Sequence, residues 1–80
     1  MMTFSKINSV ITDDKEALYD ICYDDTKDYE FTPHYRTLKR AKVLYIKDYH
    51  DWCADIIVFT DGSTRYVWPI AYIKSINISK

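Results

Sequence analysis

A single Asp-Gly pair, Asp61-Gly62, is the feature that most constrains the fold of this chain, because Gly62 is its only glycine. Glycine adopts positive φ without steric cost, and an Asp-Gly pair between two strand-forming runs is a strong signal for a tight β-hairpin. The flanking runs, residues 55–60 and 64–68, are rich in β-branched and aromatic side chains. Side chains alternate along a strand, so each run presents two faces. One predicted face consists of Ile57, Phe59, Tyr66 and Trp68, and the other consists of Ile56, Val58 and Val67.

Both faces of the predicted hairpin are apolar, so each face needs cover from another part of the chain. Such a hairpin suits the interior of a small barrel, or a sheet backed by a helix. The run before it, residues 41–47, predicts a neighbouring strand. Alternation along that strand would place Val43 and Tyr45 on one face, with Leu44 and Ile46 on the other.

The N-terminal residues predict one extended segment and one helix. Residues 4–11 are expected to form a strand, although Phe4, Ile7, Val10 and Ile11 also fit a helical stripe. A helix is predicted over residues 13–23, because Asp13 and Glu16 have the spacing of a capping box. Its apolar edge would consist of Leu18, Ile21 and Cys22. A helix of about three turns is marginal in isolation, so we expect it to pack on the sheet.

The middle of the chain is polar. Residues 24–30 are mostly acidic and predict a loop. Residues 31–35 are expected to be an extended linker or edge, because Pro33 lacks the amide that an interior strand requires. A short basic segment, residues 36–40, then leads into the predicted strand at 41–47.

The C-terminal part completes a recognisable layout. Pro69 should end the outgoing strand of the hairpin, residues 70–73 should form a single helical or 3₁₀ turn, and residues 75–78 a last short strand. This order over residues 41–78, with its Asp-Gly hairpin and proline turn, resembles an SH3-like small barrel. The resemblance is architectural and implies no mechanism. The expected fold is α+β: a small antiparallel sheet, possibly an SH3-like partly open barrel, with one short N-terminal helix packed on it.

Size and charge limit the function classes. The 80 residues suffice for one domain, 1–80, with a net charge of −1. Charge is segregated: residues 1–35 contain three lysines and eight acidic residues, whereas residues 36–47 contain five basic residues and no acidic one. No apolar run approaches the roughly 18 residues of a membrane span, and no signal peptide is recognised. A cytoplasmic protein with free thiols at Cys22 and Cys53 is expected.

Catalysis and metal binding find little support in the sequence. His50 and Cys53 lie three positions apart, a spacing that can bring a base and a thiol together in a turn but more often points them apart in an extended segment. The paired spacings typical of zinc ligands are missing. The lone glycine is already assigned to the hairpin, so a glycine-rich phosphate loop is excluded. We therefore expect a protein that is not an enzyme and that needs no cofactor or metal.

The high aromatic content favours a protein-binding role. Tyr, Trp and Arg dominate interface hot spots, and eight tyrosines are more than so small a core can hold. The sequence predicts a monomer or small homo-oligomer that occupies a surface of a larger protein partner, as small phage-type inhibitors do. The candidate partner-binding residues are Asp24, Asp25, Asp28, Tyr29, Glu30, Tyr35, Arg36, Lys39, Arg40, Tyr49 and Trp52.

Nucleic-acid or nucleotide binding is the alternative. Cations and aromatic residues interleave within residues 35–52, as a groove that follows a phosphate backbone and stacks bases would require. The residues concerned are Tyr35, Arg36, Lys39, Arg40, Lys42, Tyr45, Lys47 and Trp52. Pairing of this basic segment with the acidic loop would instead make it a solvated, neutralised surface. The sequence leaves both alternatives open.

Overall fold

A computed structural model describes residues 2–11, 16–27, 29–47 and 55–80. Within these residues the chain forms one short α-helix, one 3₁₀ turn and five strands that make a single antiparallel sheet. The elements are α1 (Phe4–Val10), β1 (Tyr19–Asp24), β2 (Tyr35–Lys47), β3 (Ile56–Thr60), β4 (Arg65–Pro69), the 3₁₀ turn η1 (Ile70–Tyr72) and β5 (Ile73–Ile78). The expected combination of a small antiparallel sheet with one short helix is confirmed.

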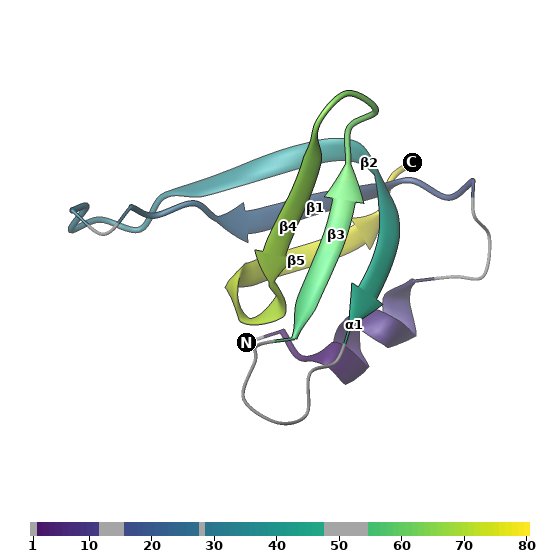
Figure 1. Cartoon of the computed structure of the whole chain (residues 1–80), viewed down its shortest axis with the longest axis horizontal. Helices are drawn as coiled ribbons and strands as arrows, with labels where there is room; N and C mark the ends of the chain where they lie inside the picture. Colours follow the sequence, from purple (N-terminus) through teal and green to yellow (C-terminus); the bar gives the residue numbers. More distant parts are fainter. Residues whose placement is uncertain (1, 12–15, 28, 48–54) are drawn as a thin grey trace.

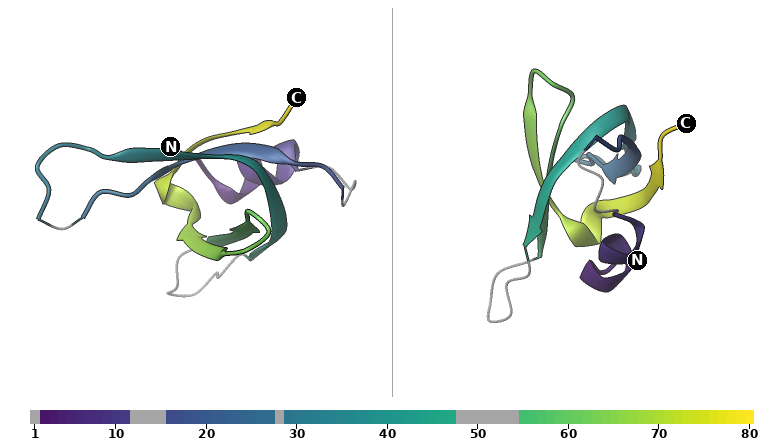
Figure 2. Two further views of the ribbon diagram at one scale, coloured as in Figure 1. Left: turned by 90° about the horizontal axis from the view of Figure 1, so that it is seen from above. Right: turned by 90° about the vertical axis from the view of Figure 1, so that its right-hand side faces the viewer.

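The strands follow the order β4-β3-β2-β1-β5, so the long strand β2 is central. Its first half pairs with β1 and its second half with β3. β2 bends between these halves, which folds the sheet into two layers (Figures 1 and 2). Among the described strands β4 and β5 pair on one side only, so the sheet is not closed.

Two β-bulges interrupt β2. At the first, Tyr19 pairs with Ala41 but Ile21 pairs with Leu38, and the extra residue Arg40 has a positive φ of 56°. The backbone amide of Arg40 donates to the Asp20 carboxylate at 3.1 Å. A bulge inserts an unpaired residue and bends the strand. The bend of β2 thus coincides with a residue in the left-handed conformation.

The second bulge corrects the predicted faces of β2. Val43 pairs with Phe59 and Tyr45 pairs with Val58, so Leu44 is the extra residue. Directly opposed side chains lie on the same face. Val43 therefore joins the core beside Phe59, whereas Tyr45 points away from the core. The prediction of strict alternation over residues 41–47 was wrong.

The hairpin around Gly62 is confirmed. Gly62 has a φ of 102°, and the Asp61 amide donates to the Thr64 carbonyl at 3.4 Å. The Asp61 carboxylate accepts hydrogen bonds from the Ser63 and Thr64 amides at 2.9 and 2.8 Å, which lowers the pKa of Asp61. The predicted shared face is also confirmed by the cross-strand pairs Ile57–Trp68 and Phe59–Tyr66.

The core lies between the two layers of the sheet. Its fully buried members come from α1, β1, β2, β3, η1 and β5, and the Tyr23 ring contacts Phe59 and Trp68 at centroid distances of 5.8 and 5.0 Å. Burial raises the pKa of Tyr23. The buried cluster consists of Ile7, Tyr19, Ile21, Tyr23, Ala41, Ile57, Phe59, Ile70, Ile73 and Ile76.

The N-terminal predictions were wrong in both elements. Residues 4–10, predicted as strand, form α1: the Thr3 side chain caps it by accepting from the Lys6 amide at 3.2 Å, and Ile7 enters the core. Part of the predicted helix 13–23 is instead strand β1, whose burial alternates residue by residue. The two-residue repeat of Tyr19, Ile21 and Tyr23 prevails because β2 and β5 pair with it on both sides. Residues 12–15 lie outside the described residues.

The C-terminal predictions agree with the structure. Pro69 ends β4, residues 70–72 form a 3₁₀ turn, and β5 includes the expected strand but begins at Ile73. β2 begins at Tyr35, earlier than predicted, so the basic segment 36–40 is strand. No helix in the described residues is long and apolar enough to cross a membrane.

Candidate functional site

Residues 25–27 and 29–34, in the connection from β1 to β2, project from one end of the molecule (Figure 1). We call these residues the β1–β2 arm. Most of its acidic groups act within the arm: the Asp25 carboxylate lies 2.8 Å from Arg36 Nε and 3.2 Å from Lys27 Nζ. Glu30 accepts from the Lys27 amide at 3.0 Å and lies 3.4 Å from His34 Nδ1. The arm is therefore stabilised by three side chains that were predicted to bind a partner, those of Asp25, Glu30 and Arg36.

Asp24 and Thr26 form the base of the arm. The Thr26 amide donates to the Asp24 carboxylate at 2.8 Å, and the Thr26 hydroxyl donates to the same oxygen. These bonds hold the pKa of Asp24 below its ordinary value, and a hydrogen bond from Lys27 does the same for Asp25. The Thr26 hydroxyl also accepts from the His34 amide at 2.8 Å, which ties the two sides of the arm together. Asp24 is thus an ionised, oriented carboxylate.

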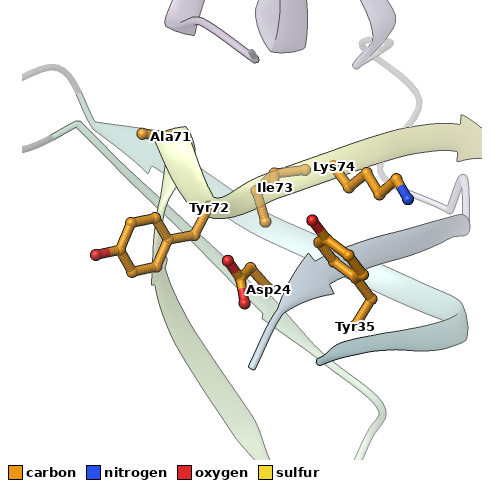
Figure 3. Close-up of a pocket in the computed structure, with 6 residues that line it drawn as sticks. All are labelled: Asp24, Tyr35, Ala71, Tyr72, Ile73 and Lys74. Carbon is orange, nitrogen blue, oxygen red and sulfur yellow. The ribbon is translucent and has the colours of Figure 1, made fainter. Parts of the chain in front are cut away.

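An open pocket of about 230 Å³ lies beside this base (Figure 3). Asp24 ends β1 and Tyr35 begins β2 as its cross-strand partner, so their side chains share one face. Tyr72 comes from η1 on the other side of the pocket. In Figure 3 the Asp24 carboxylate lies between the Tyr72 and Tyr35 rings. The lining residues are Asp24, Tyr35, Ala71, Tyr72, Ile73 and Lys74.

The pocket combines exposed aromatic surface with one carboxylate, that of Asp24, and one lysine, Lys74. Tyr35 is 45% exposed and Tyr72 is 55% exposed. Lys74 Nζ lies 4.2 Å from the centre of the Tyr35 ring, a cation–π contact at the edge of the pocket. Two tyrosine rings beside a carboxylate can hold the apolar stem of a ligand side chain and pair with a positive group on it. The pocket is therefore chemically suited to an extended segment that carries a cation.

The core holds this pocket in place. Trp68 Nε1 donates to the Asp24 carbonyl at 3.0 Å, which joins β4 to the end of β1. Ile70, the first residue of η1, is buried, and its amide donates to the Asp55 carbonyl at 2.9 Å. Tyr72 therefore projects from a turn that is fixed on two sides. A site built on such rigid elements is positioned before a ligand arrives.

Two aromatic side chains on the arm are almost fully exposed. Tyr29 is 81% exposed and Phe31 is fully exposed. Large apolar side chains on a projecting segment are suited to filling a pocket on a partner. The sequence had predicted Tyr29, but it missed Phe31, Tyr72 and Lys74. The signals for Tyr72 in the sequence were its place in the turn after Pro69 and the surplus of tyrosines over what the core can hold.

The structure divides the remaining predicted residues into separate groups. Tyr35 joins the pocket, whereas Lys39 and Arg40 lie further along β2, beyond the base of the arm. Asp28, Tyr49 and Trp52 lie outside the described residues, as do His50 and Cys53, which had been weighed for catalysis and metal binding. In the described part of the chain, Cys22 is a half-buried free thiol and no cluster of metal-ligating side chains occurs. Comparison of the chain with known protein families, characterised proteins and solved structures finds no match.

Proposed function

We propose that this protein is a non-enzymatic binding module that acts stoichiometrically by occupying a surface of a larger protein partner. The observation that carries the proposal is the pocket in which Tyr35 and Tyr72 flank the ionised Asp24. The exposed side chains of Tyr29 and Phe31 add a second contact region on the arm. Blocking of the occupied partner surface would make the protein a small inhibitor, the role expected from the sequence.

We further propose that the fold is an SH3-like arrangement with an open sheet. Support comes from the strand order, the tight β3–β4 hairpin and the 3₁₀ turn between β4 and β5. Several small recognition domains bind polyproline II segments in grooves lined by aromatic side chains, because such segments are already extended and lose little entropy on binding. The ligand that fits the pocket best is an extended, proline-containing segment with an Arg or Lys directed to Asp24.

Chemical-shift titration of the isotope-labelled protein with synthetic peptides tests this site. A proline-rich peptide with one arginine should shift the amides of Asp24, Tyr35 and Tyr72. Replacement of Tyr72 by alanine should weaken binding about 5- to 30-fold, as removal of an aromatic hot spot does. The matched control is Tyr45→Ala, since Tyr45 is 51% exposed on a different face of the sheet.

The role of the carboxylate is tested with a second peptide in which glutamine replaces the arginine. Asp24→Asn should weaken the arginine peptide about tenfold, because a charge-assisted pair is lost, and should leave the glutamine peptide unchanged. Equal effects on both peptides would contradict the assigned role of Asp24. Shifts confined to residues outside the pocket would contradict the proposed site.

A further inference from the structure

The outer face of β2, β3 and β4 has a composition quite different from the pocket. Directly opposed side chains of paired strands point to the same side of a sheet. The strand register places Lys42, Thr60 and Arg65 in one row across this face, and Tyr45, Val58 and Val67 in the next row. We call these two rows the outer β2–β4 face. Val58 is fully buried outside the core cluster, so the middle of this face is covered, whereas Tyr45 and Val67 on either side of it are exposed.

The charge of this face is of one sign. Neither row contains a carboxylate, and both Lys42 and Arg65 are exposed. Lys27, His34 and Arg36 form ion pairs in or beside the β1–β2 arm, and neither Lys42 nor Arg65 takes part in these pairs. The acidic arm therefore does not neutralise these two cations.

An exposed aromatic ring lies next to the cations. Tyr45 is 51% exposed and Val67, in the same row, is 54% exposed. The bulge at Leu44 produces this arrangement, because without it alternation from Val43 would direct Tyr45 to the core. β3 lies between β2 and β4, so Arg65 and Val67 lie two strand spacings, roughly 10 Å, from Lys42 and Tyr45 on the same face.

We propose that the outer β2–β4 face binds single-stranded nucleic acid, with Tyr45 stacking on a base and with Lys42 and Arg65 contacting phosphates. Unpaired cations around an exposed ring match a polyanion that displays aromatic bases. The face shares no residue with the pocket, so this inference is independent of the proposed peptide site.

Binding of this kind has a characteristic salt dependence. Each phosphate contact with a single strand contributes about −0.7 to the slope of log affinity against log salt concentration. Lys42 and Arg65 together should therefore contribute about −1.4 to that slope. Stacking on Tyr45 adds an affinity that salt does not remove, because it requires no counterion release.

The test is fluorescence anisotropy with a labelled single-stranded DNA of mixed sequence, measured over a range of salt concentrations. The double variant Lys42→Gln with Arg65→Gln should lose about tenfold or more in affinity at low salt, and its slope should flatten by about 1.4. The matched control is Lys27→Gln with Lys74→Gln, which removes the same charge from the arm and the pocket edge and should leave affinity unchanged. Circular dichroism should confirm that both variants fold.

A second variant tests base stacking separately from charge. Tyr45→Ala should weaken binding about 5- to 100-fold with an unchanged salt slope, whereas Tyr45→Phe should retain affinity. No binding of the wild-type protein at low salt would overturn the proposal. The proposal would also be overturned by equal losses of affinity in the two double variants or by no effect of Tyr45→Ala. Binding of heparin as tight as that of single-stranded DNA would overturn it as well, since each of these results would show a site that does not recognise bases.

Discussion

Replacement of Arg40 by valine and by glycine should reverse the stability order that holds in a regular β-strand. Arg40 has a φ of 56° within β2, where its amide donates to Asp20. In ordinary strands valine is among the most stabilising residues and glycine among the least, and the scale of strand propensities spans about 1 kcal/mol. In the left-handed conformation the preference is opposite, because the Cβ atom crowds the following carbonyl oxygen.

The magnitude follows from two opposing contributions. Glycine relieves left-handed strain of about 1 to 2 kcal/mol, and its greater freedom in the unfolded chain costs about 0.5 to 1 kcal/mol. Arg40→Gly should therefore raise the free energy of unfolding by about 0 to 1.5 kcal/mol. Arg40→Val places a β-branched residue at positive φ, so it should lower the free energy of unfolding by about 1 to 2 kcal/mol relative to wild type. The expected gap between the two variants is about 2 kcal/mol in favour of glycine.

Urea unfolding followed by tryptophan fluorescence measures this gap. A small protein has an m-value near 1 kcal/mol per molar urea, so the two midpoints should differ by about 2 M. Lys42 is the matched control, because it pairs regularly with Thr60 and should show the ordinary order, with valine more stable than glycine. A valine variant at position 40 that is more stable than the glycine variant would refute the bulge and the bend of β2 that it produces.

Two further predictions concern the core and the turn. Phe59→Leu should lower the free energy of unfolding by about 1.5 to 3 kcal/mol, because the variant loses the ring contacts with Tyr23 and Tyr66. Urea titration measures this loss. The control is Val67→Ala on the exposed face, which should change the free energy of unfolding by less than about 0.5 kcal/mol. Folding lowers the pKa of Asp61, so its contribution to stability is present above the unfolded pKa of about 4 and is lost as pH falls through the folded pKa. Thermal unfolding should therefore show a shallower acid dependence for Asp61→Asn than for wild type, and equal dependences would contradict the role of this carboxylate.

The parts of the fold that could be predicted are those set by residues close together in the sequence. The Gly62 turn, the end of β4 at Pro69 and the 3₁₀ turn after it follow from local backbone preferences. The N-terminal elements could not be predicted in this way. Residues 19–23 fit both a helical and an alternating pattern, and pairing with β2 and β5 decides between them.

The candidate sites were less predictable than the fold. Tyr29 and Tyr35 could be proposed from their residue types, and their exposure agrees with that expectation. Tyr72 joins Tyr35 only because β5 returns to pair with β1, more than forty residues after it in the chain. Long-range pairing of this kind leaves no signal in the spacing of residues.

The sequence by itself determined the hairpin, its two faces and the segregation of charge, because these depend on the backbone freedom of one glycine, on alternation and on composition. The tertiary structure alone decided which charges are paired and which aromatic rings are exposed. One extra residue at Leu44 turns Tyr45 outward. Asp25 pairs with Arg36, whereas Lys42 has no acidic partner in the described part of the chain. The physical reason is that a register shift of a single residue reverses every side chain beyond it, and only the pairing of distant strands sets that register.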